Sequence, residues 1–168
     1  AAQNNTAKLG FSDRFALHTG ELADTRFLEN LRMEASPVQL VMANPPWRLV
    51  GSGRLPATEA RRKALFGDKG TLPLFASAAS SLLEEDGRFA CIISPDRLQD
   101  MLAALDGAGL TPYLLQYIHK QKTSPATFVL IEARKGAHAK PSVAEPIALY
   151  GPERFFTLES LAFCPFLR

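Results

Sequence analysis

The stretch VQLVMANPPW, residues 38–47, decides how the rest of this sequence is interpreted. Residues 38–43 form an apolar run, which predicts a buried β-strand. The asparagine, two prolines and tryptophan that follow cannot continue a sheet easily, because proline fixes φ and has no N–H to donate. We therefore expect the strand to end at Ala43 and a rigid loop to begin at Asn44.

Strand-like and helix-like segments alternate along the chain. Strands are expected over residues 14–18, 38–43 and 88–94, and helices over residues 25–35, 72–83 and 96–105. The remaining expectations are the end of a helix over residues 1–9 stopped by Gly10, a loop over 48–70, a strand pair over 110–120 and 127–133, a surface connection over 137–146 and a short edge strand over 147–150. This order predicts an α/β fold, in which a mostly parallel sheet is covered by helices on both faces and ends in an antiparallel strand pair.

Composition places the chain among ordinary globular domains. It has 168 residues, 46% of them hydrophobic and 21% charged, and a net charge of +2, which suits a single domain with its own core. No apolar run approaches the length of a membrane span and no signal segment opens the chain, so we expect no membrane partner. The two cysteines and three histidines show no ligand spacing, which predicts no metal site; the cysteines also fit a reducing, cytoplasmic location.

The loop after residue 43 has the side chains that a pocket for a planar amine requires. Ligands bind beyond the carboxyl ends of strands in open α/β sheets. The Asn44 side-chain carbonyl and the Pro45 backbone carbonyl are suitable acceptors for the two N–H bonds of such an amine, and Trp47 offers a face on which a base can stack. The competing interpretation is that the prolines only end the strand and that Trp47 packs in the core. The buried strand before the loop and the aromatic after it favour the pocket.

The same residues resemble a known motif. Residues 41–47 resemble the (Asn/Asp)-Pro-Pro-(Tyr/Phe/Trp) motif of class I S-adenosylmethionine-dependent amino-methyltransferases. Further stretches are similar to the bacterial tRNA adenine-N6 methyltransferases that modify valine tRNA beside the anticodon: Gly51-Ser52-Gly53-Arg54-Leu55-Pro56 with Glu59-Ala60-Arg61, then Gly87-Arg88-Phe89, and residues 130–136. The resemblance covers nearly the whole chain. It implies a Rossmann-like class I methyltransferase fold, S-adenosylmethionine as cofactor, RNA (most of all tRNA) as partner, and Asn44, Pro45, Pro46 and Trp47 as the catalytic motif.

The chain departs from that family in two ways. Trp47 stands where the tRNA group usually has tyrosine, which keeps the stacking face but alters the width of the pocket. No Asp-x-Gly-x-Gly pattern occurs, although these enzymes hold the cofactor with such a loop after their first strand. Ala2-Gln3-Asn4-Asn5 is similar to the helix after the family's second strand. We therefore expect residues 1–168 to be the C-terminal portion of a methyltransferase domain whose first two strands lie between the strands at 14–18 and 38–43.

Residues outside the motif complete the predicted site. The resemblance implies that Glu21 and Asn44 contact the cofactor. The alternative interpretation of Glu21 is a solvated turn residue. Arg48, Arg54, Arg61 and Arg62 form a basic group after the motif, together with Lys63 and Lys69, and suit phosphate contacts near a flipped base. A solvated loop explains the same charges.

Three functions remain open from the sequence. The leading one is methyl transfer from S-adenosylmethionine to adenine N6 in RNA. The second is methylation of a protein glutamine amide, as in release-factor methyltransferases, which share the motif because an amide nitrogen also has a delocalised lone pair. The third is a non-catalytic domain that binds RNA or a partner, since no cofactor loop is present.

Overall fold

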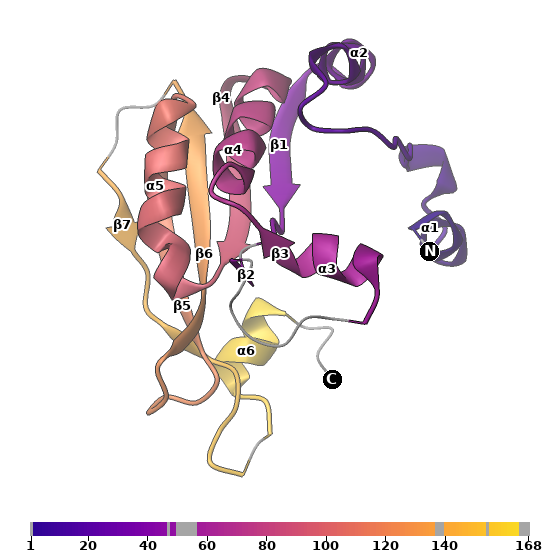
Figure 1. The fold of residues 1–168 in the computed structure, drawn as a ribbon. Coiled ribbons are helices and arrows are strands. Elements are labelled where there is room, and N and C mark those ends of the chain that lie inside the picture. Colours follow the sequence, from indigo (N-terminus) through magenta and orange to yellow (C-terminus); the bar gives the residue numbers. More distant parts are fainter. Residues whose placement is uncertain (1, 47, 50–56, 137–139, 154, 165–168) are drawn as a thin grey trace.

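A mixed β-sheet forms the centre of the molecule (Figure 1). The computed structural model of the chain describes residues 2–46, 48–49, 57–136, 140–153 and 155–164. The strands of the sheet are β1 (Val38–Ala43), β4 (Leu83–Ile93), β5 (Leu110–His119), β6 (Ala126–Lys135), β7 (Ser142–Val143) and β8 (Ile147–Ala148). Their order is β1-β4-β6-β5-β7, and β8 also pairs with β5. β6 runs antiparallel to β4 and β5, whereas the other pairs are parallel, so the predicted mostly parallel sheet with an antiparallel pair is confirmed.

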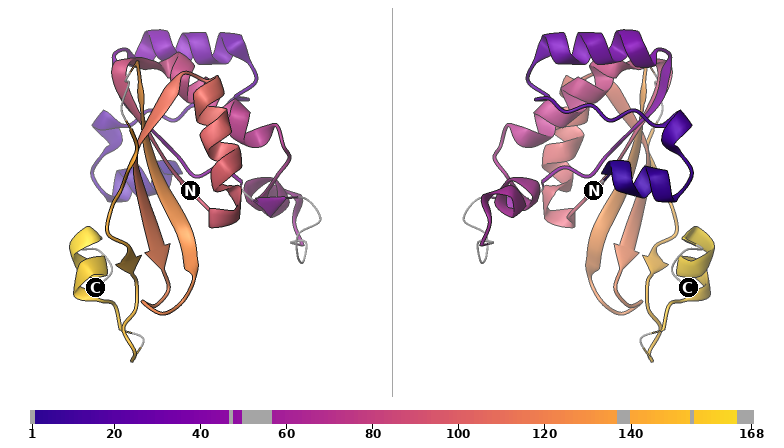
Figure 2. Two further views of the ribbon diagram at one scale, coloured as in Figure 1. Left: turned by 90° about the vertical axis from the view of Figure 1, so that its left-hand side faces the viewer. Right: turned by 90° about the vertical axis from the view of Figure 1, so that its right-hand side faces the viewer.

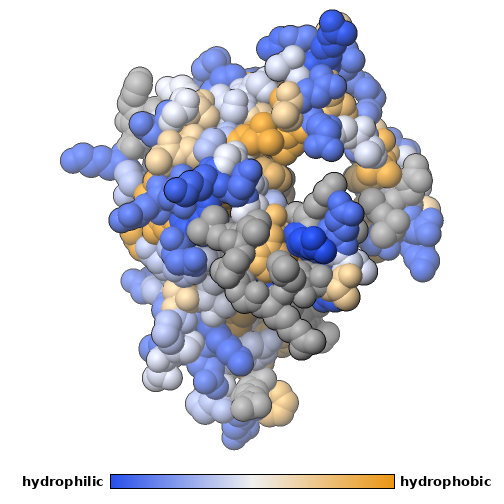
Figure 3. Space-filling model, viewed as in Figure 1, coloured by the Kyte–Doolittle hydropathy of each residue, from blue (hydrophilic) through white to orange (hydrophobic). Residues whose placement is uncertain are grey.

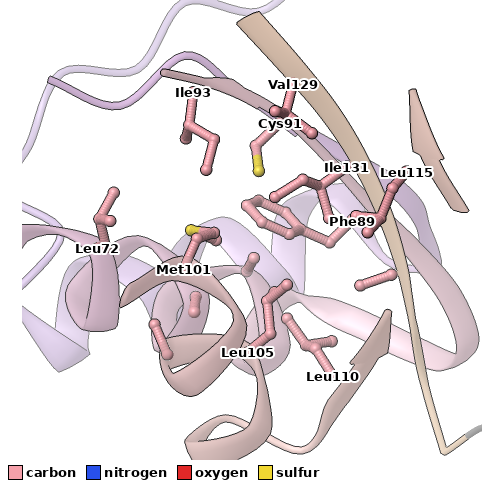
Figure 4. Packing of buried hydrophobic residues seen from close by; sticks show 14 of the residues in the cluster. Leu72, Phe89, Cys91, Ile93, Met101, Leu105, Leu110, Leu115, Val129 and Ile131 are labelled. Carbon is pink, nitrogen blue, oxygen red and sulfur yellow. The ribbon is translucent and has the colours of Figure 1, made fainter. Parts of the chain in front are cut away.

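Two helices, α4 (Thr71–Leu82) and α5 (Leu98–Gly107), cover one face of this sheet (Figures 1 and 2). Alternate side chains of β4 point at these helices because successive residues of a strand face opposite sides. Phe89, Cys91 and Ile93 are therefore buried, and they meet Leu72 and Met101 from the helices in one core (Figure 4). The other labelled residues of this core are Leu105, Leu110, Leu115, Val129 and Ile131.

The opposite face of the sheet is largely uncovered in the described part of the chain, so the expectation of helices on both faces is wrong. Figure 2 places α4 and α5 on one side and only α1 and α6 (Leu158–Phe163) on the other. The physical reason is the handedness of the connections. β1 to β4 and β4 to β5 are parallel crossovers that advance in the same direction, and right-handed crossovers of that kind put their helices on the same face.

β1 is an edge strand with apolar side chains on both of its faces. It pairs with β4 and with no other strand among the described residues. Leu40 is 43% exposed and Met42 76% exposed, so the prediction of a buried strand over residues 38–43 is wrong in burial, although its bounds are confirmed. Figure 3 shows hydrophobic surface at the position that β1 occupies in Figure 1. An uncovered apolar edge of this kind is a site where further polypeptide can pair.

The N-terminal segment contains helices and no strand in its described residues. α1 (Ala2–Lys8) ends where Gly10 has a φ of 71°, as expected of a glycine stop. α2 (Thr25–Ala35) has the predicted bounds, and the Asp24 carboxylate accepts from the N–H groups of Arg26 and Phe27. The strand predicted over residues 14–18 is wrong: η1 (Ser12–Arg14) is a 3-10 turn, and residues 15–20 pair with no described strand. An alternating sequence makes a strand only when a neighbouring strand accepts and donates its hydrogen bonds.

The segment over residues 48–70, predicted as a loop, contains regular structure in its described parts. β2 (Arg48–Leu49) pairs in parallel with β3 (Phe66–Gly67), and α3 (Glu59–Leu65) lies between them in sequence. Thr58 caps the start of this helix, because its hydroxyl accepts from the N–H of Arg61. The helix itself consists of good helix formers. No helix in the described part of the chain is both long enough and apolar enough to cross a membrane.

Lys135 joins the end of β6 to the end of α4. Its Nζ donates to the carbonyl oxygens of Ser80 and Leu83, each at 2.8 Å. A cation at the C-terminal end of a helix satisfies carbonyls that the helix leaves without partners. β4 starts at Leu83 directly after this helix, so it is longer than the strand predicted over residues 88–94, and the register with β1 shifts before Arg88.

The thiol of Cys91 provides a test of the packing of this core. Burial raises the pKa of Cys91 from 9.0 to about 12. Because the folded state disfavours the thiolate, this contribution to stability is fully present below pH 9.0 and is lost as the pH rises through about 12. At about pH 8 we expect a thiol reagent to label the partly exposed Cys164 and to leave Cys91 unmodified until the chain unfolds. A Cys164→Ser variant isolates the core thiol; rapid labelling of that folded variant would contradict the packing.

Candidate functional site

The Asn44-Pro45-Pro46 segment leaves the sheet at the carboxyl end of β1. Ala43, the last residue of the strand, is in register with Cys91 of β4. Pro45 is fully buried, whereas Asn44 is exposed and Pro46 is partly buried. A buried proline with a fixed φ anchors the backbone that presents the Asn44 amide and the Pro45 carbonyl. Trp47, the fourth residue of the predicted motif, lies outside the described residues.

A cavity of about 650 Å³ runs from Asn44 across the uncovered face of the sheet. Its wall consists mainly of apolar residues from several strands and from α6: Met42, Ala43, Ala90, Cys91, Ile92, Leu114, Leu130, Ile131 and Phe163. The polar residues of the wall are Asn44, Gln116 and Glu132. Glu132 forms an ion pair with Arg88 at 3.3 Å, and the Gln116 amide donates to the Glu145 carbonyl. Asn44 is therefore the polar residue of this mainly apolar wall that lies at the end of β1.

The basic residues predicted to bind the substrate lie after the motif on β2 and α3. Arg48 is exposed on β2, and Arg61 and Arg62 are exposed on α3. Figure 1 shows α3 beyond the end of β1, on the side where the motif leaves the sheet. Arg54 and the side chain of Lys63 lie outside the described part, and Lys69 is exposed. The structure thus puts described arginines at the motif's end of the sheet.

Glu21 is not brought to Asn44. Its carbonyl accepts from the N–H of Asp24 in an exposed turn before α2, and it is absent from the wall of the cavity beside Asn44. α2 leads into the beginning of β1, whereas Asn44 follows the end of that strand (Figure 1). Contact of Glu21 with the cofactor stays a prediction.

The segment that follows β4 is a neighbour of the motif that sequence reasoning missed. Because β1 and β4 are adjacent and parallel, their carboxyl ends meet at one edge of the sheet. The Ser94 hydroxyl donates to the Asp96 carboxylate there, and Arg97 is only 3% exposed, with Nε donating to Asp100 Oδ2 at 2.7 Å. A buried, paired guanidinium fixes this turn. The signal in the sequence was a proline directly after a second apolar strand, as after β1.

The described residues contain no group of three or more histidines, cysteines, aspartates or glutamates that could hold a metal ion. The polar groups at the end of β1 are instead amide and carbonyl acceptors. Such groups stabilise a positive charge that develops on a nitrogen, and they do so through fixed dipoles.

Comparisons with known proteins establish the fold. No protein-family model and no curated protein matches this chain. A predicted O-methyltransferase from Agrobacterium tumefaciens is similar in structure, with a TM-score of 0.68 and 20% identity over 99% of this chain and 68% of that chain. An O-methyltransferase family protein from Burkholderia thailandensis has a TM-score of 0.49 and 13% identity over 81% of this chain and 40% of that chain.

The complex of M1.HpyAVI with SAM has a TM-score of 0.43 and 12% identity over 75% of this chain and 62% of that chain. The likeness to the Agrobacterium tumefaciens protein spans nearly all of this chain. Together with the strand order, it shows that the chain has the Rossmann-like fold of class I methyltransferases.

Proposed function

We propose that this chain carries the substrate-binding part of an S-adenosylmethionine-dependent methyltransferase that methylates the exocyclic N6 amine of adenine in RNA, with tRNA as the substrate. The observation that carries the proposal is the presentation of Asn44 at the carboxyl end of β1, where the buried Pro45 fixes the backbone. Ligands of open α/β sheets bind at this edge.

The chemistry that these residues supply is acceptance of two hydrogen bonds. The lone pair of an adenine amine is delocalised into the ring, so the nitrogen is a weak nucleophile. When Asn44 Oδ1 and the Pro45 carbonyl accept its two N–H bonds, the nitrogen becomes pyramidal and its lone pair points away from the ring. S-adenosylmethionine, held by a further segment, would supply the methyl group: its S–CH3 bond would break as the N–CH3 bond forms, and S-adenosylhomocysteine would leave as a neutral thioether. The nitrogen then carries a positive charge, which the two carbonyl dipoles stabilise until one N–H proton passes to solvent.

Two neighbouring hydrogen-bond acceptors favour nitrogen over oxygen as the atom that receives the methyl group. A hydroxyl group has one O–H to donate, whereas an exocyclic amine or a carboxamide has two N–H bonds. Two carbonyl acceptors therefore match the donors of an amine, and one of them would have no partner on a hydroxyl. A hydrogen bond that is not made in the complex forgoes roughly 0.5–1.5 kcal/mol, which favours an amine over an alcohol.

The described residues do not by themselves fit the cofactor. The methionine end of S-adenosylmethionine carries an ammonium and a carboxylate, but the wall of the cavity beside Asn44 is apolar apart from Gln116 and Glu132, both of which already have partners. We therefore propose that the cofactor is held between Asn44 and a further segment of the same polypeptide. That segment would cover the apolar face beside β1, which exposes Leu40 and Met42.

The choice of RNA over a protein amide rests on the charge of α3. Arg61 and Arg62 are both exposed on this helix, at the motif's end of the sheet (Figure 1). Exposed arginines contact phosphates through forked N–H donors, and such contacts orient a nucleic acid without reading its sequence. A glutamine side chain in a protein offers no comparable anionic backbone.

Charge reversal on α3 tests this choice. We expect the double variant Arg61→Glu/Arg62→Glu, made in the natural protein that carries this chain, to raise the KM for unmodified tRNA by about tenfold or more, because two phosphate contacts become repulsive. The matched control is Arg26→Glu/Arg32→Glu, which reverses two exposed charges on α2. An equal effect of the two double variants would contradict a specific role of α3.

A methyl-transfer assay identifies the substrate class. The same protein is given unmodified tRNA and a release factor, together with labelled S-adenosylmethionine, and the label on each is measured. Transfer to tRNA supports the proposal. Transfer to the release factor alone supports an amide substrate, and binding of tRNA without any transfer supports a non-catalytic RNA-binding role. Either of the last two results would overturn the proposed function.

A further inference from the structure

Directly after the motif, the chain pairs with β3 in a short parallel strand pair. β2 begins at Arg48, and in its register with β3, Arg48 is opposite Phe66 and Leu49 is opposite Gly67. Phe66 and Gly67 are both buried. The segment that leaves Pro46 is therefore held against β3, which a three-residue turn separates from α4, one of the two helices that cover the core.

Gly67 approaches the motif so closely that a side chain would not fit. A Cβ built at this glycine would lie 2.5 Å from the Pro46 carbonyl oxygen, 2.7 Å from Thr71 Oγ1 and 2.9 Å from Thr71 Cβ. The backbone of β3 thus packs between the motif and the first residue of α4. Glycine is required here because the backbone lies so close to Pro46 and Thr71. Its φ is not positive, so backbone conformation alone does not demand glycine.

A hydrogen-bonded turn fixes Gly67 relative to α4. The Asp68 N–H donates to Thr71 Oγ1 at 3.0 Å, and the Thr71 hydroxyl donates to Asp68 Oδ1 at 2.9 Å. The Gly70 N–H also donates to Asp68 Oδ1 at 2.9 Å. Hydrogen bonds to the Asp68 carboxylate lower its pKa, and the bond from the Thr71 hydroxyl has the largest effect. The next residue of the helix, Leu72, is fully buried in the core.

We propose that Gly67 is a positioning residue, which sets the place of the Pro46 carbonyl and through it the two acceptors on Asn44 and Pro45. This inference rests on the function proposed above. The contacts form a continuous path from the core through Leu72 and Thr71 to Gly67 and Pro46. Gly67 touches the motif backbone and not the substrate, so it acts by orientation.

The size of the effect follows from the geometry. The Pro46 oxygen must move about 0.9 Å to turn the 2.5 Å approach into an ordinary contact of 3.4 Å. Misplacing a reacting group by 1 Å can cost on the order of a hundredfold in rate. Part of the movement will be absorbed by the Thr71 side chain, so Gly67→Ala is expected to lower kcat about tenfold and to leave the KM for S-adenosylmethionine within about twofold.

Two matched glycine variants separate positioning from loss of stability. Gly87→Ala also meets a backbone atom, with its Cβ 2.8 Å from the Glu84 carbonyl, but Gly87 lies four residues before Cys91, the partner of Ala43, and so about 13 Å from the end of β1 by strand rise. Gly107→Ala meets nothing within 4 Å. We expect Gly87→Ala to lower the melting temperature without changing kcat in the folded fraction. Gly107→Ala is expected to leave kcat unchanged and not to lower the melting temperature, because alanine is a better helix former than glycine.

Fluorescence provides a readout that does not depend on catalysis. Trp47 is the only tryptophan of the chain, and it adjoins both Pro46 and the first residue of β2 in sequence. We expect Gly67→Ala to shift its emission maximum or to change its acrylamide quenching constant by twofold or more, and the two control variants to leave both unchanged. Wild-type fluorescence and kcat in folded Gly67→Ala would overturn the inference.

A second variant serves if Gly67→Ala does not fold. Thr71→Val keeps the shape of the side chain and removes both of its hydrogen bonds with Asp68. It is expected to lower kcat about threefold and to increase quenching of Trp47 while the far-UV spectrum stays that of the wild type; unchanged kcat and quenching would count against the inference. The wild type could methylate no nucleic acid while Gly67→Ala still changes Trp47 fluorescence and the two control variants do not. In that case the proposed function fails, and the placement of the motif by Gly67 stands.

Discussion

Replacement of Asn44 by alanine is expected to reduce methyl transfer by about a hundredfold to a thousandfold in kcat. The side-chain carbonyl is one of two acceptors that we assign to the amine, and removing one preorganised group of this kind typically costs about 2.7–4 kcal/mol of transition-state stabilisation. Asn44 is exposed at the end of β1, so its loss leaves the core intact. Single-turnover rates with saturating tRNA measure the effect.

The control for this prediction is a conservative change at the same position. Asn44→Asp keeps carbonyl-type acceptors and is expected to retain more activity than Asn44→Ala by at least about tenfold. Gln39→Ala removes an exposed amide from β1, the strand that Asn44 follows, and should have no effect on rate. Both alanine variants should melt within about a degree or two of the wild type, because exposed substitutions change stability by about 0.5 kcal/mol or less. Asn44→Ala with wild-type kcat would exclude the assigned role.

Replacement of Trp47 by alanine is expected to lower kcat/KM for tRNA by roughly tenfold to a hundredfold. The expectation comes from the sequence, since this residue lies outside the described part of the structure. Stacking of a base on an aromatic side chain contributes about 1–3 kcal/mol, which corresponds to this range. The loss should appear for an adenine-containing RNA and be absent from the affinity for S-adenosylmethionine.

The aromatic variant Trp47→Tyr distinguishes stacking from simple packing. Tyrosine keeps a flat face and is expected to recover most of the activity that alanine loses. If Trp47→Ala and Trp47→Tyr lower the melting temperature by several degrees and leave kcat/KM unchanged, Trp47 is a packing residue and the prediction is wrong.

Local signals in the sequence placed the elements of the fold well. Asp24 and the apolar spacing after it give α2 its observed bounds, and the change to proline after Ala43 gives the end of β1. The antiparallel strands β5 and β6 follow from long apolar runs separated by turn residues. These signals depend on residues close together in sequence, which is why they can be read without knowing the tertiary structure.

Features that depend on distant partners were predicted less well. Residues 14–18 have the alternation of a strand but no described neighbour with which to pair, and β1 has two apolar faces of which only one is covered. α3 was overlooked because its many charges were interpreted as a loop, although Thr58 caps it. The same limit applies to the site: Asn44 was correctly placed at a strand end, whereas the approach of Gly67 to Pro46 depends on packing between segments that the sequence separates.

The most direct test of the central claim identifies the methylated nucleoside. The natural protein that carries this chain is incubated with unmodified tRNA and methyl-labelled S-adenosylmethionine, and the tRNA is digested and analysed by mass spectrometry. The label is predicted in N6-methyladenosine, and it should disappear when Asn44→Ala replaces the wild type. Label on a ribose or base oxygen, or label confined to added protein, would contradict the assignment of an adenine amine to the acceptors at the end of β1.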